Sequence, residues 1–261
     1  MLDRRSIGIG LGASALALGA LAARPAAAQQ FSADLVETPS ATQDVTTRIF
    51  RSGNKMRFQI LRGSTPVGGS IYDLDQNTIT IYNDSLHTFG TAHLTPQAAT
   101  GILRNSLVLA AVDPANPCPA WTAMLQAARQ RAGEKPQQLT CTDMGTGPLN
   151  GRAAHKWNVT SDAGPGTYSA WVDVSLRVPS KGQDDEGKGI ELKNLAEGSQ
   201  PAALFAPPAG YKEGPIVSVS PAMRSLLGDA AKEIENGAAA AATDAAKQKV
   251  QQKVRKLFHV P

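Results

Sequence analysis

The sequence is poor in the residues on which many catalytic and metal sites depend. Among 261 residues there are two cysteines and four histidines. The histidines, at positions 87, 93, 155 and 259, have no motif partner at short range. The P-loop, the G-x-S-x-G nucleophile elbow and the H-E-x-x-H zinc motif are all absent from the sequence. These absences argue against a nucleotide-dependent enzyme, a hydrolase with that elbow and a zinc peptidase of that type.

The apolar run near the start of the chain is short and rich in small residues for a membrane span. Residues 7–23 include five Gly or Ser residues, whereas about 20 apolar residues are needed to cross a bilayer. Arg4 and Arg5 precede the run, and Ala26-Ala27-Ala28 follows it. This layout is typical of a secretory signal cleaved before Gln29, with a membrane anchor as the alternative.

The predicted signal places the mature chain in the periplasm. No cysteine lies near the cleavage site, so a lipid-modified N-terminus is not expected. Arg4-Arg5-Ser6-Ile7 resembles a twin-arginine signal, but paired arginines also occur in ordinary secretory signals. The sequence leaves both export routes open.

The net charge does not point to nucleic acid as a partner. The chain carries 26 basic and 22 acidic residues. Residues 1–28 contain three arginines and one aspartate, which leaves 23 basic and 21 acidic residues, or a net charge of +2, after cleavage. The sequence pI of about 9.1 therefore overstates the basicity of the folded part.

The two cysteines predict one disulfide. Cys118 and Cys141 are 23 positions apart, and an even pair in an exported chain most simply forms a bridge. The alternative is a reactive thiol, or a metal site completed by His155. The spacing matches no zinc pattern, which favours the disulfide.

The first part of the mature chain has the pattern of an antiparallel β-meander. Met56, Phe58 and Ile60 alternate with polar residues, which indicates one buried and one wet face. The expected strands are 45–51, 55–61, 67–73 and 78–83, and the gaps at 52–54 and 75–77 have turn chemistry.

Two helices are expected after the meander. Thr95-Pro96 is typical of a helix start, and apolar residues then recur at helical spacing as far as Ala110. After a proline-rich gap, a second helix ends at Gly133. Its apolar stripe consists of Trp121, Met124, Leu125 and Ala128.

The remainder of the chain predicts further strands and then a helix. Strands are expected at 152–160, 167–174 and 190–195, with a turn at Asn150-Gly151, a polar loop at 183–188 and an irregular closing segment at 204–211. Residues 215–261 predict a long amphipathic helix. Its positive charges gather toward the end of the chain, within residues 247–259.

Acidic residues and histidines at three places in the sequence are candidates for chemistry. Asp173 is a candidate catalytic acid, but no partner for acid–base chemistry is identifiable. Asp184-Asp185-Glu186 lacks the ligand spacing of an EF-hand loop and is expected to be a solvated loop. His87 and His93 are six residues apart and make a weak metal pair. No cofactor and no metal are predicted.

The aromatic residues suggest a ligand cavity. They recur on successive predicted strands, and a strongly curved sheet would gather many of them on its concave face. The alternative is an ordinary core packed under the two helices. The candidate cavity residues are Phe50, Met56, Phe58, Tyr72 and Trp171. Strand parity is not fixed by the pattern, so some of these side chains are expected to face outward.

Three short motifs resemble the LolA/LolB-like group of exported bacterial proteins, and specifically its uncharacterised domain families. They are Arg48 to Phe58, with a tight turn at Gly53-Asn54; Gly151 to Trp157 followed by Trp171-Val172-Asp173 and Val178-Pro179; and Leu204 to Tyr211. Their order along residues 31–213 is the stronger part of the resemblance.

The resemblance implies an α+β fold: a half-open antiparallel β-barrel, that is a curved sheet, covered by two helices, here with a long C-terminal helix added. It implies a hydrophobic cavity, which in the carrier itself takes lipoprotein acyl chains. The carrier's arginine near the second-strand turn aligns with Ser52, next to Arg51, so its role is not transferred. The expected organisation is a signal at 1–28, a β-barrel domain at 29–214 and a helical tail at 215–261.

The sequence therefore predicts a non-catalytic periplasmic protein that binds a lipid or another apolar ligand. The expected partners are a lipid or lipoprotein acyl chain and, through residues 247–259, an anionic membrane surface. Two alternatives stay open: an envelope interaction protein that uses the basic C-terminal helix, and a hydrolase of unknown substrate.

Overall fold

The computed structural model describes residues 29–38, 45–95, 111–131, 133–162, 164–214 and 216. The predicted signal at 1–28 and most of the predicted helix at 95–110 lie outside the described residues. Nearly all of the predicted tail at 215–261 also lies outside them, including the proposed membrane-binding residues 247–259. Among the described residues, no helix has the length and apolar character needed to cross a bilayer.

Most described residues belong to one twelve-stranded sheet. Its order is β12-β6-β5-β4-β3-β2-β1-β11-β10-β9-β8-β7. The strands are β1 (Gln30–Thr38), β2 (Val45–Ser52), β3 (Lys55–Arg62), β4 (Thr65–Asp73), β5 (Thr78–Asn83), β6 (Thr88–His93), β7 (Leu139–Leu149), β8 (Arg152–Ser161), β9 (Gly164–Asp173), β10 (Pro179–Gln183), β11 (Gly189–Glu197) and β12 (Lys212–Glu213). All neighbours are antiparallel except β12 and β6.

The predicted meander and the predicted Asn-Gly turn are confirmed. β2 to β5 pair in sequence as expected. Asn150 and Gly151 join β7 to β8 with φ angles of 51° and 77°. Two successive positive φ angles match the right-handed twist of a hairpin, and asparagine and glycine adopt them at low cost.

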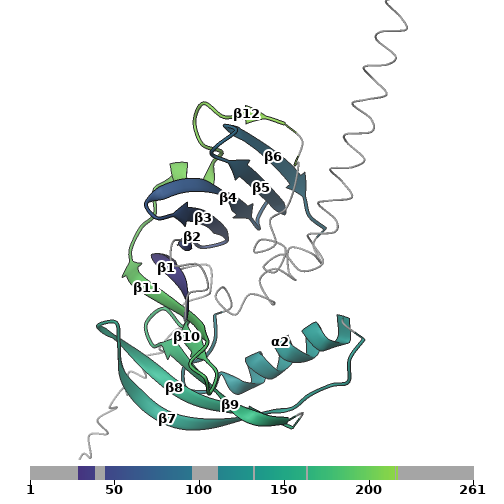
Figure 1. The fold of residues 1–261 in the computed structure, drawn as a ribbon, viewed down its shortest axis with the longest axis vertical. Helices are drawn as coiled ribbons and strands as arrows, with labels where there is room; N and C mark the ends of the chain where they lie inside the picture. Colours follow the sequence, from purple (N-terminus) through teal and green to yellow (C-terminus); the bar gives the residue numbers. More distant parts are fainter. Residues whose placement is uncertain are drawn as a thin grey trace, which may run out of the picture.

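The sheet bends strongly, so that β4–β6 and β7–β9 lie at opposite ends of a curved surface (Figure 1). Its inner face carries two apolar clusters. The larger lies on β1–β6 and includes the fully buried Phe31, Ile49, Met56 and Ile79. The smaller lies on β8 and β9 and includes Trp157, Val159, Ala170 and Val172.

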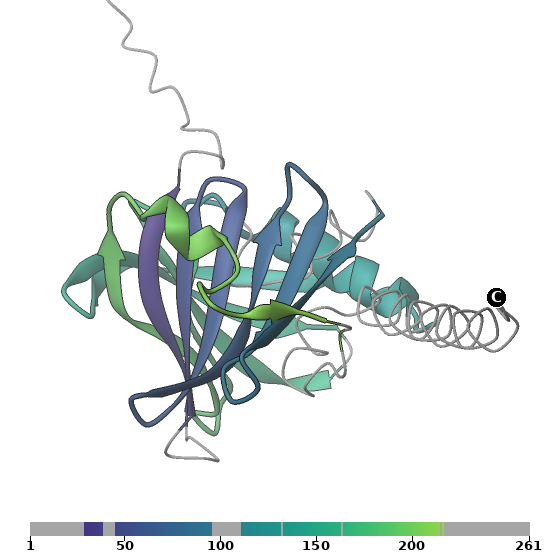
Figure 2. The ribbon, with the colours of Figure 1, turned by 90° about the horizontal axis from the view of Figure 1, so that it is seen from above.

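The outer face of β3–β6 is covered by residues 198–214. This segment contains the 3-10 helix η2 (Ala202–Phe205), which contacts β3 and β4, and ends in β12 beside β6. Figure 2, which views the molecule from above, shows this segment crossing the strands. Arg57 donates from a guanidinium nitrogen to the Leu204 carbonyl at 3.2 Å and from Nε to the Tyr82 hydroxyl at 3.1 Å. The segment is therefore anchored by a buried polar contact.

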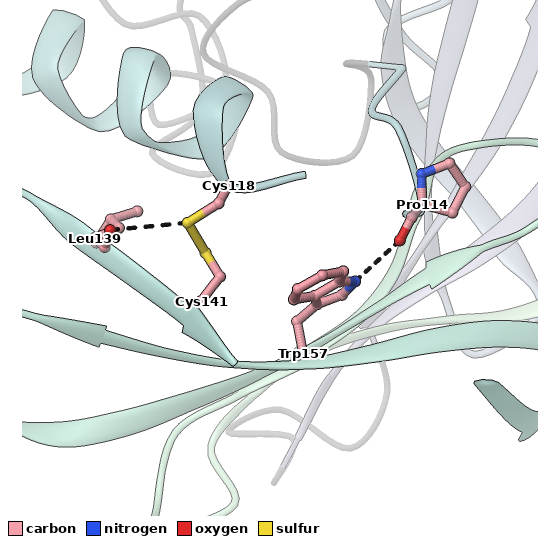
Figure 3. The surroundings of a disulfide bond; sticks show 5 residues. All are labelled: Pro114, Cys118, Leu139, Cys141 and Trp157. Carbon is pink, nitrogen blue, oxygen red and sulfur yellow. Dashed lines mark hydrogen bonds between the residues drawn. A yellow bond between two sulfur atoms is a disulfide. The ribbon is translucent and has the colours of Figure 1, made fainter. Parts of the chain in front are cut away.

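One α-helix, α2 (Cys118–Arg131), packs on the smaller apolar cluster. Its first residue forms a disulfide with Cys141 of β7, as predicted, with 5.9 Å between the two Cα atoms. Figure 3 shows this bridge beside Trp157, whose indole Nε1 donates to the Pro114 carbonyl at 3.0 Å. The bridge fixes the start of α2 against the sheet.

The predicted half-open barrel with two covering helices and a long C-terminal helix is wrong. The described residues form an open sheet whose edges, β12 and β7, are not paired with each other, and they contain α2 and η2 as their helices. Neither a second covering α-helix nor a long C-terminal helix occurs among the described elements. Local periodicity identifies strands and faces, but closure depends on long-range pairing, which it does not specify.

Candidate functional site

The main cavity of the described structure lies between α2 and the inner face of β7–β11. Its volume is about 340 Å³, within the roughly 300–1,000 Å³ range of small-molecule sites. The lining is mainly apolar and comes from seven elements. It consists of Leu35, Trp121, Met124, Leu125, Ala128, Leu139, Val159, Tyr168, Ala170, Pro179, Ser180, Lys181, Gly182, Ile190, Glu191 and Leu192.

The α2 wall is the apolar stripe that the sequence predicts for this helix. Trp121, Met124, Leu125 and Ala128 all line the cavity. Trp121 is 6% exposed, and its indole Nε1 has no hydrogen-bond acceptor within the described part of the chain. A buried donor without an acceptor costs roughly 1–3 kcal/mol. The Trp121 residue of this apolar wall therefore carries a buried N–H donor without a partner among the described residues.

The opposite wall depends on a glycine. Gly182 of β10 lies under the Tyr168 ring, and a Cβ atom added at Gly182 would be 2.1 Å from the Tyr168 hydroxyl oxygen. Burial, followed by the negative charge of Asp184, raises the pKa of Tyr168. The ring therefore occupies space that a larger residue at position 182 would fill.

The two charged residues of the lining have their charged groups on the other face of the sheet. Lys181 pairs in register with Trp171 and Glu191, whereas Gly182 pairs with Ala170 and Ile190 on the inner face. The Lys181 Nζ atom lies 3.8 Å from Glu191 Oε2 and 5.2 Å from the centre of the Trp171 ring. This arrangement leaves the inner lining largely uncharged.

A second, more open pocket adjoins one end of the cavity. It shares Leu139, Val159 and Tyr168 with the cavity lining and has a volume of about 400 Å³. Its other residues are mostly polar and belong to the segments near the β8–β9 and β10–β11 turns. Asp184 and Asp185 are the charged residues of its lining. We call this pocket the acidic mouth.

The five predicted cavity residues lie elsewhere on the sheet. Met56, Phe58 and Tyr72 are buried in the inner-face cluster of β1–β6, where the Phe58 and Tyr72 rings meet edge to face at 5.5 Å. Phe50 and Trp171 are partly exposed, and their register places them on the outer face. None of the five lines the main cavity, and their contact with a ligand stays a prediction.

The candidate catalytic acid, Asp173, is engaged in structural contacts. It is 2% exposed and accepts two hydrogen bonds from the Arg152 guanidinium, at 2.6 and 3.1 Å. Its Oδ1 also accepts the Leu176 backbone N–H at 2.8 Å. These bonds hold the turn after β9 and join it to the start of β8.

The remaining candidates for chemistry are dispersed. Within the described ranges, no group of three or more His, Cys, Asp or Glu side chains is arranged to hold a metal ion. His87 lies in the β5–β6 turn beside the Tyr211 ring, and His93 ends β6. His155 stacks on Trp157 and lies 2.6 Å from Asp143 on the neighbouring strand β7.

No protein-family model and no curated protein matches this chain. Solved structures with some likeness include PNGF-II, at 10% identity and a TM-score of 0.38, over 77% of this chain and 33% of that one. MucB alone gives 18% identity and a TM-score of 0.39, over 68% and 56% of the two chains. MucB in complex with MucA(peri) gives 16% and 0.40, over 69% and 55%.

The chain thus spans about a third of the PNGF-II chain and just over half of the MucB chains. TM-scores this low do not establish a shared fold.

Proposed function

We propose that this protein binds a small apolar ligand in the cavity between α2 and β7–β11, without catalysing a reaction on it. The apolar lining of this cavity, at about 340 Å³, is the observation that supports the proposal most directly. The volume lies near the lower end of the range for ligand sites. One acyl chain or a molecule of similar size suits it better than the several chains of a lipoprotein.

The unpaired indole N–H of Trp121 adds a preference within this class. The Nε1 atom lies in a residue that forms the cavity wall, and it has no acceptor among the described residues. The Nε1 atom is itself buried, so a ligand oxygen reaches it only if the indole turns toward the cavity; such a contact would recover part of the cost of the buried donor. We expect ligands with an acceptor atom to bind more tightly than pure hydrocarbons.

The proposed location is the periplasm. The Cys118–Cys141 bridge is of a kind that persists in oxidising compartments. Residues 1–28 have the layout of an export signal. An apolar molecule in an aqueous compartment needs a protein or a membrane to shield it from water.

The test is binding of an uncharged environment-sensitive dye such as Nile red. Ala128 and Ala123 lie on the same helix, but Ala128 lines the cavity and Ala123 does not. Ala128→Leu should therefore weaken dye binding at least about fivefold by filling the site, while Ala123→Leu leaves it unchanged. Equal binding by both variants and the unaltered protein would place the ligand elsewhere.

Native mass spectrometry after gentle purification gives an independent check. A co-purified apolar molecule that is lost in Ala128→Leu supports the proposal. Repeated absence of any such molecule, together with no dye binding, would contradict it.

A further inference from the structure

The acidic mouth joins the cavity at the Tyr168 end. The two pockets share Leu139, Val159 and Tyr168, so a ligand whose apolar body fills the cavity can place its polar end in the mouth. Apart from those three, the mouth is lined by polar or small residues: Gln137, Thr160, Ser161, Gly164, Pro165, Gly166, Thr167, Asp184 and Asp185. From the cavity to the mouth the lining becomes more polar and gains two carboxylates, which matches the shape of an amphiphile.

The charge of the mouth is negative. Asp184 and Asp185 are its charged residues, and no lysine or arginine belongs to its lining. The nearest basic residues in sequence are Lys181 and Lys188. Lys181 pairs with Glu191 on the outer face, and Lys188 pairs with Glu186 on the exposed loop. Neither Asp184 nor Asp185 forms an ion pair within the part of the chain that the structure describes.

The two carboxylates are held in place by the backbone. Asp184 Oδ1 accepts the backbone N–H groups of Glu186 and Lys188 at 3.0 and 2.8 Å. Asp185 Oδ2 accepts the Thr167 N–H at 2.7 Å. The Asp185 bond joins the β10–β11 loop to β9. All three strands, β9, β10 and β11, line the cavity. The negative charge therefore has a fixed position relative to the cavity.

The acidic loop alone would be an ordinary solvated turn. Its significance comes from the adjoining apolar cavity and from Trp121, whose buried indole N–H has no acceptor in the described structure. The cavity points to a ligand independently of the acidic residues. The mouth adds a negative charge at the place where the polar end of the ligand would lie.

We propose that the site selects amphiphiles with a cationic head group over those with an anionic one, with the apolar body in the cavity and the head in the acidic mouth. The inference rests on the proposed function, because it assigns the ligand class of the same site. It distinguishes a long-chain amine or quaternary ammonium compound from a fatty carboxylate.

The experiment compares three probes that share a dodecyl chain, each used below its critical micelle concentration. They are dodecyltrimethylammonium, dodecyl maltoside and dodecanoate. The affinity of each probe is measured by its displacement of Nile red from the full chain. At low ionic strength the cationic probe should bind about five- to tenfold more tightly than dodecanoate, with the maltoside between them. The difference should shrink in 0.5 M salt, because exposed charges are screened over about a Debye length.

The double variant Asp184→Asn with Asp185→Asn tests the origin of this preference. Asparagine keeps an oxygen that accepts the three backbone N–H groups but removes both charges. The variant should equalise the cationic and anionic probes and leave the maltoside affinity unchanged. The control, Asp75→Asn with Glu213→Gln, removes two exposed charges from β12 and the β4–β5 turn and should keep the preference.

The outcomes separate this inference from the proposed function. Binding of all three probes with equal affinity, or preference for dodecanoate, overturns the charge selection and leaves the cavity as an apolar site. A preference that survives in the Asp184→Asn, Asp185→Asn variant also overturns it. Failure of every probe to bind overturns the proposed function itself.

Discussion

The two halves of the sheet use their inner faces differently. In the closed half, which is β1–β6 with residues 198–214, large side chains fill the inner face, and residues 198–214 cover the outer face of β3–β6. In the cavity half, which is β7–β11 with α2, the helix α2 packs over the inner face and leaves a space of about 340 Å³. One continuous sheet thus supports a filled core and an apolar site.

The difference follows from side-chain size and from how each half is covered. The closed half buries Phe31, Met56, Phe58 and Tyr72, and these rings and chains reach one another directly. The cavity half has the small Ala170 at the corresponding face of β9, whereas the Tyr168 ring occupies the space over Gly182 of β10. A small residue such as Ala170, under a helix that is fixed at its first residue, leaves room that neighbouring side chains do not fill.

The largest expected effect comes from removing a large side chain from the core of the closed half. Phe58→Ala removes a ring that is 3% exposed, and should lower the free energy of unfolding by about 3–5 kcal/mol. Phe50→Ala is the matched control, because Phe50 is only half-buried on the outer face of the adjacent strand. Urea denaturation measures both. Similar losses for the two variants would contradict the assignment of a filled inner face.

The disulfide gives the largest effect in the cavity half. Replacing Cys118 and Cys141 together by Ser opens a loop of 23 residues, and should cost about 3 kcal/mol by the chain-entropy account. Amide hydrogen exchange locates the loss. We expect faster exchange in α2 and β7, with β2–β5 keeping their relative protection. Uniform loss of protection across both halves would show that they do not differ in this way.

A third prediction places the same substitution in each half. Ala33 is 2% exposed within the filled core, whereas Ala170 is 6% exposed and lines the cavity. Ala33→Leu should cost about 1–3 kcal/mol through overpacking, because the core has no space for the added atoms. Ala170→Leu should change the free energy of unfolding by less than about 1 kcal/mol, because the cavity accommodates the leucine. Thermal or urea unfolding would contradict the comparison if the two losses were equal.

Strand content and local turns were accessible from the sequence. The alternation in Met56, Phe58 and Ile60 predicts β3, the Asn150-Gly151 pair predicts the β7–β8 hairpin, and the stripe from Trp121 to Ala128 predicts the apolar face of α2. These features depend on neighbours close in sequence. The disulfide was likewise predictable from the pair of cysteines and is confirmed.

The position of the cavity was not accessible in the same way. β1 pairs with β11, although Phe31 and Glu197 are far apart in the chain. The parity that turns Phe50 and Trp171 to the outer face depends on register across such pairs. Burial of Arg57 beneath Leu204 likewise requires residues 198–214 to cross the sheet. The apolar stripe of α2 was the usable signal for this wall, but a stripe alone does not distinguish a core-facing surface from a cavity wall.

The smallest predicted effect is alkaline weakening of the closed half. Burial first, with a further contribution from Asp84 and Tyr211, raises the pKa of Tyr82 to about 12, and the hydrogen bond to Asp84 raises that of Tyr211 to about 12. Both exceed the ordinary value of 10.0. The unfolded chain therefore loses these protons first, so stability is full below pH 10 and falls between pH 10 and 12.

The Tyr211→Phe variant checks this assignment. It removes the hydrogen bond to Asp84, so the free energy of unfolding should fall less steeply above pH 10 than in the unaltered protein. Urea midpoints measured across this range provide the comparison. An unchanged slope would mean that Tyr211 does not contribute.

The central claim, that the space under α2 is a ligand site, is tested most directly by the indole N–H signals of the three tryptophans. Trp121 lines the cavity, Trp157 donates to Pro114, and Trp171 lies on the outer face. In a ¹⁵N–¹H NMR titration with dodecyl maltoside below its micelle concentration, the Trp121 signal should shift saturably while the Trp171 signal stays in place. A shift of Trp171 alone, or no shift of Trp121 at saturating probe, would contradict the account.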